Sequence, residues 1–176
     1  MYLIKFEVLT VNYYFRKLRT TDIENLWSLI EILKREKVDM SFAEIQNKNE
    51  LLDFIDNPAE LTYIAVTKEN PMQVLCLVKG KRKLSKDKSH SVLLSAATHP
   101  NARGHGLVAK LTNFALEEMK NEGVTIARSY VYSNNTASLN AIKKLDFIHA
   151  GTIIRHHRNS ETGEYVDDLI FHKILD

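Results

Sequence analysis

The chain has 176 residues, of which 44% are hydrophobic and 26% are charged, so its composition excludes an intrinsically disordered chain and its length predicts one domain over residues 1–176. Because 24 Lys and Arg residues face 22 Asp and Glu residues, the net charge of +2 gives no strong attraction to nucleic acid or to an anionic membrane. The single cysteine and the lack of a signal peptide or a long apolar run predict a cytoplasmic protein without disulfides.

The first half of the chain is predicted to contain a strand, two helices and a hairpin. The aromatic and β-branched segment 11–19 favours a strand. Apolar residues at helical spacing predict a helix over residues 23–37, and a shorter helix is expected over residues 48–55. Segments 61–68 and 72–79 both have the composition of strands, and the turn residues between them predict a hairpin.

The second half alternates strands and helices and ends in a second hairpin. Segment 91–98 is almost continuously apolar, which is typical of a strand that is buried on both faces. The remaining predicted elements are an amphipathic helix from residue 107 to a terminating glycine at 123, a strand over 124–132, an N-capped helix after residue 135, and strands over 147–157 and 164–175. This order predicts an α/β fold with antiparallel edges and one internal crossover.

Residues 100–109 join the apolar strand to the amphipathic helix and contain two of the six glycines. A glycine-rich turn at this place lets backbone amides that have no partner inside the helix converge on one point. The helix dipole and Arg103 add positive charge, so the turn favours a phosphate or pyrophosphate group. The spacing also permits Gly104 and Gly106 to serve only as turn residues. It matches neither a Walker loop nor a dinucleotide-binding fingerprint.

The sequence of this turn, H-P-N-A-R-G-H-G-L-V-A at residues 99–109, is the first of two informative motifs. It resembles the acyl-CoA motif [RQ]-x-x-G-x-[GA] of the GNAT N-acetyltransferase superfamily, which follows a proline at the end of the fourth strand. Arg103 and Gly106 match this motif, whereas Val108 stands where a small residue is usual.

The second motif lies on the following helix and resembles N-x-x-[AS]-x-x-x-Y-x-x-x-G-F of the same superfamily. Three residues stand at matching offsets, namely Asn135, Ser138 and Phe147. Ile142 replaces the tyrosine of the motif, and Asp146 replaces its glycine. The resemblance follows the order of elements over about residues 13–175 and is specific within residues 94–147.

This resemblance implies a GNAT-like fold, with a mixed, mostly antiparallel sheet whose fourth and fifth strands splay apart, and it implies acetyl-CoA as the co-substrate. The pantetheine arm would pair with the backbone of Ala96, Ala97 and Thr98 in the gap between these strands. The pyrophosphate would lie beside Arg103 on the amides of Gly104, His105, Gly106, Leu107, Val108 and Ala109. Asn135 would contact the pantetheine region, and no metal is expected.

The same resemblance implies direct attack of an amine on the thioester, which needs a proton acceptor for the amine and a proton donor for the departing thiolate. Ile142 cannot donate a proton, and the base position of some members falls on Tyr130, which is not a carboxylate. Tyr130 and Tyr132 alternate to one face of their strand. We predict Tyr132 as the proton donor and Tyr130 as a wall of the acceptor pocket, with simple packing as the alternative for both.

The last hairpin of the chain borders the acceptor groove in the superfamily that this sequence resembles. Asp167 and Asp168 are adjacent in a strand, so at most one of them is expected to face the groove and hold a cationic amine, and protection of an edge strand is the alternative. His156 and His157 are likewise expected on opposite faces and therefore not as a pair of metal ligands. Cys76 is expected to be a small core residue.

The resemblance therefore predicts an enzyme that moves acetyl from acetyl-CoA to a primary amine of a small molecule or a protein. The missing motif tyrosine leaves a non-catalytic acyl-CoA binding module as the alternative. Nucleic-acid binding through the basic segment 79–88 is disfavoured, because that segment lacks interleaved aromatic residues and suits a solvated loop. The identity of the amine and the formation of a homodimer both stay open.

Overall fold

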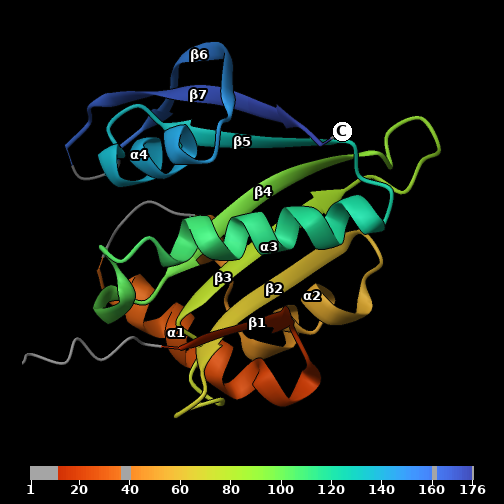
Figure 1. Cartoon of the computed structure of the whole chain (residues 1–176). Helices are drawn as coiled ribbons and strands as arrows, with labels where there is room; N and C mark the ends of the chain where they lie inside the picture. Colours follow the sequence, from red (N-terminus) through yellow and green to blue (C-terminus); the bar gives the residue numbers. More distant parts are fainter. Residues whose placement is uncertain (1–11, 37–40, 160–161, 176) are drawn as a thin grey trace, which may run out of the picture.

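The computed structural model describes residues 12–36, 41–159 and 162–175, which contain a seven-stranded sheet in the order β1-β2-β3-β4-β5-β7-β6 (Figure 1). The strands are β1 (Tyr13–Lys17), β2 (Glu60–Thr67), β3 (Cys76–Arg82), β4 (Ser91–Thr98), β5 (Ile126–Tyr132), β6 (Ile148–Arg158) and β7 (Tyr165–Ile174). Neighbouring strands are antiparallel except for β4 and β5, which are parallel. The mixed, mostly antiparallel α/β fold is therefore confirmed.

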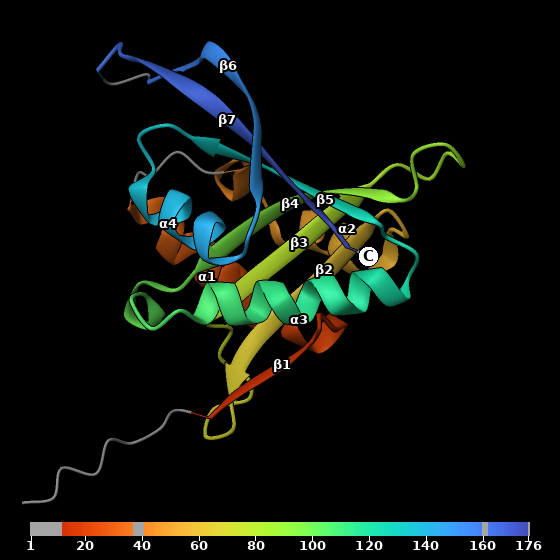
Figure 2. The same ribbon diagram turned by 45° about the horizontal axis from the view of Figure 1, so that its top comes forward.

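Helices cover both faces of this sheet (Figures 1 and 2). The helices are α1 (Ile23–Arg35), α2 (Asp53–Asp56), α3 (Leu107–Asn121) and α4 (Thr136–Lys144). Side chains of α3 and α4 belong to one buried apolar cluster, and those of α1 and α2 belong to another. The helix α3 is the crossover that makes β4 and β5 parallel. None of the described helices has the length and apolar composition that a membrane span needs.

The strand that is buried on both faces is β2 rather than β4. Six successive side chains of β2 are buried from Leu61 to Val66. Those of Leu61, Tyr63 and Ala65 belong to the cluster of α3, and those of Ile64 and Val66 belong to the cluster of α1. The prediction that segment 91–98 is buried on both faces was wrong, because Leu93 of β4 is 39% exposed. Its side chain lies on the face opposite α3, where the described helices do not cover it.

The strand predicted over residues 72–79 lies instead at Cys76–Arg82. Pairing with β2 extends β3 into the basic segment, where Lys79 and Lys81 each approach the buried carboxylate of Glu60 at 3.4 Å. The hydrophobic pattern of a single segment cannot show an ion pair between two strands. The predicted strand therefore began and ended several residues before the observed one. Lys79 also lies 4.1 Å above the ring of Phe54, so the first part of segment 79–88 is packed strand rather than solvated loop.

The other predicted elements are present with small changes at their ends. The helix expected over residues 48–55 consists of a 3-10 turn, Lys48–Leu51, followed by α2. Residues 11 and 37, which were expected at the ends of the first strand and the first helix, lie outside the described residues.

Gly80 of β3 approaches α3 so closely that a side chain would meet a buried residue. A Cβ atom at Gly80 would lie 2.6 Å from Cε and 2.9 Å from Sδ of Met119, which is fully buried. We expect Gly80→Ala to lower the free energy of unfolding by about 1–3 kcal/mol, because Met119 must move within a packed core. Urea unfolding measures this loss. Gly151→Ala in β6, where a Cβ has open space, is the control, and equal losses in both variants would contradict the close contact.

Candidate active site

The strands β4 and β5 separate in the middle of the sheet (Figure 1). Within the described chain, their pairing begins with Ser91 opposite Ile126 and ends with Leu94 opposite Ser129. Beyond this point β4 continues along β3 and β5 continues along β7. The opening confirms the splay that was expected between the fourth and fifth strands, and Ala96, Ala97 and Thr98 lie along it.

The turn between β4 and α3 closes one end of the opening. Gly104 and Gly106 have φ values of +82° and +69°, which side chains other than glycine rarely adopt. A Cβ atom at either position would meet no atom of the described chain within 4 Å, so both glycines face open space. Leu107, by contrast, is 1% exposed, and its side chain packs in the core and anchors the first turn of α3 there. His105 is exposed, whereas Val108 and Ala109 are half-buried.

Backbone amides line this turn. In the part of the chain that the structure describes, the amides of residues 104–109 donate no hydrogen bond, and the first one inside the helix runs from Lys110 to the carbonyl of Gly106 at 3.2 Å. The first N–H groups of a helix have no acceptor within it and carry the positive end of its dipole. A phosphate or pyrophosphate group therefore fits this turn well.

The side chain of Arg103 points to the end of α1. Its Nη1 and Nη2 atoms donate to Oε1 and Oε2 of Glu36 at 2.9 and 2.6 Å, and its Nε atom donates to the carbonyl of Thr98 at 3.3 Å. These bonds lower the pKa of the Glu36 carboxyl from its ordinary value of 4.5. Sequence reasoning expected Arg103 beside the pyrophosphate and had no signal for Glu36, which lies 67 residues away.

We expect Arg103→Ala and Glu36→Gln to weaken CoA binding by a similar factor of about two to five, because Arg103 braces the turn through Glu36 and Thr98. A bidentate but exposed ion pair contributes up to about 1 kcal/mol, which corresponds to this factor.

Because the pKa of Glu36 is lowered in the folded protein, the pair is intact at neutral pH and is lost as the pH falls through that lowered value. Calorimetric titration with CoA measures both variants. Tighter binding by Glu36→Gln would show instead that phosphate competes with Glu36 for Arg103.

The second motif corresponds to the start and the end of α4. Oδ1 of Asn135 accepts a hydrogen bond from the backbone N–H of Ser138 at 3.0 Å, so the Asn and Ser of the motif form an N-cap. Asp146, which replaces the motif glycine, has a φ of +58°, a conformation that aspartate tolerates better than most residues. Ile142, at the position of the motif tyrosine, is 8% exposed and packs in the cluster with α3.

Two tyrosines lie on β5 beyond its pairing with β4. Tyr130 is 50% exposed. The ring of Tyr132 stacks on the ring of His157, with centroids 4.8 Å apart and an interplanar angle of 21°. Tyr132 lies opposite Asp168 in the register of β5 and β7. The structure therefore places both tyrosines beside the opening, on the face that strand alternation predicts.

The two aspartates of β7 have different surroundings. Asp168 is 5% exposed, and its Oδ2 atom lies 2.8 Å from Nδ1 of His156. Asp167 is half-buried, and its Oδ1 atom accepts the backbone N–H of Arg155 at 2.7 Å. Each carboxylate thus has a partner on β6, which sequence reasoning did not anticipate.

The expectation that His156 and His157 point to opposite faces was wrong. The register of β6 against β7 shifts between Ile153 and His157, and Arg155 within this bulge has a φ of +54°. A bulge breaks the alternation of side chains along a strand. His156 therefore contacts Asp168, and His157 stacks on Tyr132, which is opposite Asp168 in the sheet.

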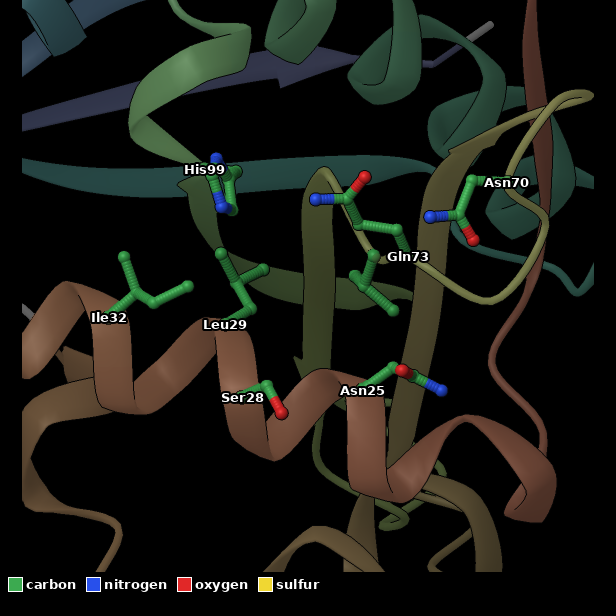
Figure 3. A pocket seen from close by; sticks show the side chains of 8 residues that line it. Asn25, Ser28, Leu29, Ile32, Asn70, Gln73 and His99 are labelled. Carbon is green, nitrogen blue, oxygen red and sulfur yellow. The ribbon is translucent and has the colours of Figure 1, made fainter.

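A separate pocket of about 230 Å³ lies on the α1 face of the sheet (Figure 3). Its polar lining comes from the side chains of Asn25, Ser28, Asn70 and Gln73. His99 borders it, and its Nδ1 atom accepts the backbone N–H of Asn101 at 3.2 Å, so this histidine caps the turn that follows β4. None of the described residues that line this pocket is among the predicted CoA-binding or catalytic residues.

Cys76 has the character of a core residue. It is fully buried, and burial raises the pKa of its thiol to about 11, so the reactive thiolate is suppressed at neutral pH. In the described segments, no group of three or more His, Cys, Asp or Glu residues is placed to hold a metal ion.

The sequence profile of the acetyltransferase (GNAT) family matches residues 26–147, a range that contains both motifs and most of the chain. The protein therefore belongs to the GNAT family of acetyltransferases. The search of curated proteins gives no match.

Solved structures of this family share the fold. A GNAT-family acetyltransferase from Streptococcus pneumoniae has a TM-score of 0.80 and 17% sequence identity, covering 93% of this chain and 99% of that chain. A ribosomal-protein-alanine N-acetyltransferase from Brucella melitensis has a TM-score of 0.78 and 20% identity, covering 92% and 99%. The protein yncA from Salmonella typhimurium, solved with its cofactor acetyl-CoA, has a TM-score of 0.77 and 16% identity, covering 93% and 94%.

Proposed function

We propose that the protein transfers the acetyl group of acetyl-CoA to a primary amine by direct attack of the amine on the thioester. The observation that carries this proposal is the opening between β4 and β5, which ends at a glycine turn with unpaired amides at residues 104–109. A strand gap accepts an extended amide-containing chain, and the amides at a helix start accept a pyrophosphate. Both parts of CoA therefore have a complementary surface here.

The pantetheine arm would extend along Ala96, Ala97 and Thr98, with Asn135 near it at the start of α4. The pyrophosphate would take hydrogen bonds from the amides of Gly104, His105, Gly106, Leu107, Val108 and Ala109. The open space at the two glycines supports this placement, because a Cβ atom there would occupy the volume that the ligand needs. Arg103 braces the turn through its bonds to Glu36 and to the carbonyl of Thr98.

The chain supplies a proton donor beside the gap. Ile142 has no proton to give, so we assign this role to the hydroxyl of Tyr132, whose ring is held by the stack on His157. Tyr130 is half-exposed on the same face, and we assign it to the wall of the acceptor pocket. We assign Asp168 to the acceptor pocket, because it lies opposite Tyr132 in the sheet. The carboxylate of Asp167 instead accepts the backbone N–H of Arg155.

A primary amine as the acceptor agrees with the names of similar structures. The Brucella protein is named for the alanine of a ribosomal protein, and another neighbour, with a TM-score of 0.78 and 15% identity, is named for phosphinothricin. Both names describe N-acetyltransferases with different amines. We therefore propose the chemical class and leave the particular amine to experiment. We further propose one domain over residues 1–176 and a cytoplasmic location, which the buried, unpaired thiol of Cys76 suits.

Release of free CoA thiol from acetyl-CoA tests the proposal. The protein is incubated with acetyl-CoA and, in turn, an aminoglycoside, spermidine, free amino acids and a peptide with an N-terminal alanine. We expect one class of amine to accelerate thiol release over the amine-free reaction, with the acetylated amine found by mass spectrometry. CoA binding in calorimetry without acceleration by any of these amines would favour the non-catalytic acyl-CoA binding module instead.

A further inference from the structure

The hairpin of β6 and β7 (Figure 2) carries a bulge, which is a shift of register between Ile153 and His157. Ile153 pairs with Asp168 and His157 pairs with Val166. Between these two pairs β6 therefore contains two more residues than β7. Arg155 lies within the bulge in the left-handed region, and its N–H donates to Asp167. The carboxylate of Asp167 thereby stabilises the backbone conformation that turns His156 toward Asp168.

His156 and Asp168 form an oriented pair. The carboxylate of Asp168 is buried, and its Oδ2 atom lies 2.8 Å from Nδ1 of His156, whose side chain is 57% exposed. The other oxygen, Oδ1, is buried and has no hydrogen-bond partner among the described residues. Because a carboxylate oxygen accepts, Nδ1 carries the proton of the neutral imidazole and Nε2 carries the lone pair. The exposed edge of this ring is therefore able to accept a proton.

Asp168 of this pair is a cross-strand neighbour of the part of β5 that borders the gap with β4. Asp168 is directly opposite Tyr132 of β5, and such cross-strand neighbours have Cβ atoms about 5 Å apart. The next residue of β6, His157, stacks on the ring of Tyr132. The side chain of His157 therefore reaches over β7, which lies between β5 and β6, to Tyr132 on the part of β5 beyond its pairing with β4.

We propose that Nε2 of His156 accepts the proton of the attacking amine and that Asp168 is its positioning residue. This inference rests on the proposed acetyl transfer. In that step the amine nitrogen forms a bond to the carbonyl carbon, the carbon–sulfur bond breaks, and its electron pair leaves with sulfur. The proton lost by nitrogen goes to Nε2 of His156, which later releases it to water. The thiolate takes a proton from Tyr132, or from water.

The charged groups around the ring have other partners. On β6, the guanidinium groups of Arg155 and Arg158 lie 5.5 and 5.7 Å from the ring centroid of Tyr165. On β7, Asp167 is bound to the backbone of Arg155. Tyr132 of β5 and His157 of β6 stack on each other beside the pair. Among the described residues, Asp168 is the carboxylate in contact with the His156 ring.

The test is the pH dependence of kcat with the fastest amine of the thiol-release panel. A general base must be unprotonated, so we expect the wild-type rate to fall toward acid pH. His156→Gln keeps a side-chain donor for Asp168 but cannot take the proton. We expect it to lower kcat about 100-fold at neutral pH, to remove the acid fall, and to leave the KM for acetyl-CoA unchanged. Asp168→Asn should lower kcat about tenfold.

His149→Gln is the control, because it lies on the same strand seven residues away, about 20 Å at the rise of a β-strand. We expect its kcat and pH profile to match the wild type. A wild-type pH profile in His156→Gln would overturn the assignment while leaving acetyl transfer established. If no amine of the panel makes the wild-type protein release thiol faster than the amine-free reaction, the proposed function and this assignment fail together.

Nitrogen NMR of the histidine rings gives a readout that needs no substrate. We expect the neutral ring of His156 to carry its proton on Nδ1 in the wild type and to lose this preference in Asp168→Asn. A proton on Nε2 in the wild-type protein would overturn the assignment, because the exposed nitrogen would then be unable to accept one.

Discussion

Gly106→Ala is expected to weaken CoA binding by at least tenfold, or about 1.4 kcal/mol. A Cβ atom at Gly106 meets nothing in the described protein, so it extends into the space in front of the amides of residues 104–109. A pyrophosphate held by these amides would collide with the added methyl group. Calorimetric titration with CoA measures the loss, and the acetyl group is not needed for this test.

Gly123→Ala is a matched control for the backbone effect. Gly123 lies just after the other end of α3, its φ is +85°, and a Cβ there also has open space. Each substitution forces alanine into the left-handed region, at a cost of roughly 1–2 kcal/mol in stability. Both variants should therefore unfold at similar urea concentrations while only Gly106→Ala loses CoA. Equal CoA affinities in the two variants would show that the pyrophosphate binds elsewhere.

Tyr132→Phe is expected to lower kcat about 100-fold, the lower end of the effect of a well-placed general acid. Phenylalanine keeps the ring that stacks on His157 and removes only the hydroxyl, so the fold and the KM for acetyl-CoA should be unchanged. Steady-state thiol release with an identified amine measures the rate. Tyr130→Phe tests the neighbouring phenol on the same strand, and because we assign it to the pocket wall its kcat should change less than threefold.

The proton donor and the proton acceptor can be separated by pH. A general acid acts only at pH values where it is protonated, and a general base acts only where it is unprotonated. The two substitutions should therefore change opposite limbs of the pH profile of kcat. Tyr132→Phe should alter the alkaline limb, and His156→Gln the acid limb. An unchanged kcat for Tyr132→Phe at every pH would assign protonation of the thiolate to solvent.

Local sequence alone determined the parts of the site that depend on neighbouring residues. The turn at residues 104–106 needs positive φ angles, which glycine adopts without strain, and the helix that follows needs an apolar first residue, Leu107. Asn135 caps α4 through Ser138, three residues away. Because these features involve only a few consecutive residues, the element order, the family and the expected position of the CoA turn were all accessible without coordinates.

Tertiary structure alone decided which distant groups meet. Arg103 binds Glu36, 67 residues earlier, and β3 extends into a basic segment because its lysines find the buried Glu60 of β2. Strand alternation placed His156 and His157 on opposite faces, whereas the bulge around Arg155 brings one to Asp168 and the other to Tyr132. A bulge depends on the pairing of two strands, so the periodicity of one strand cannot show it.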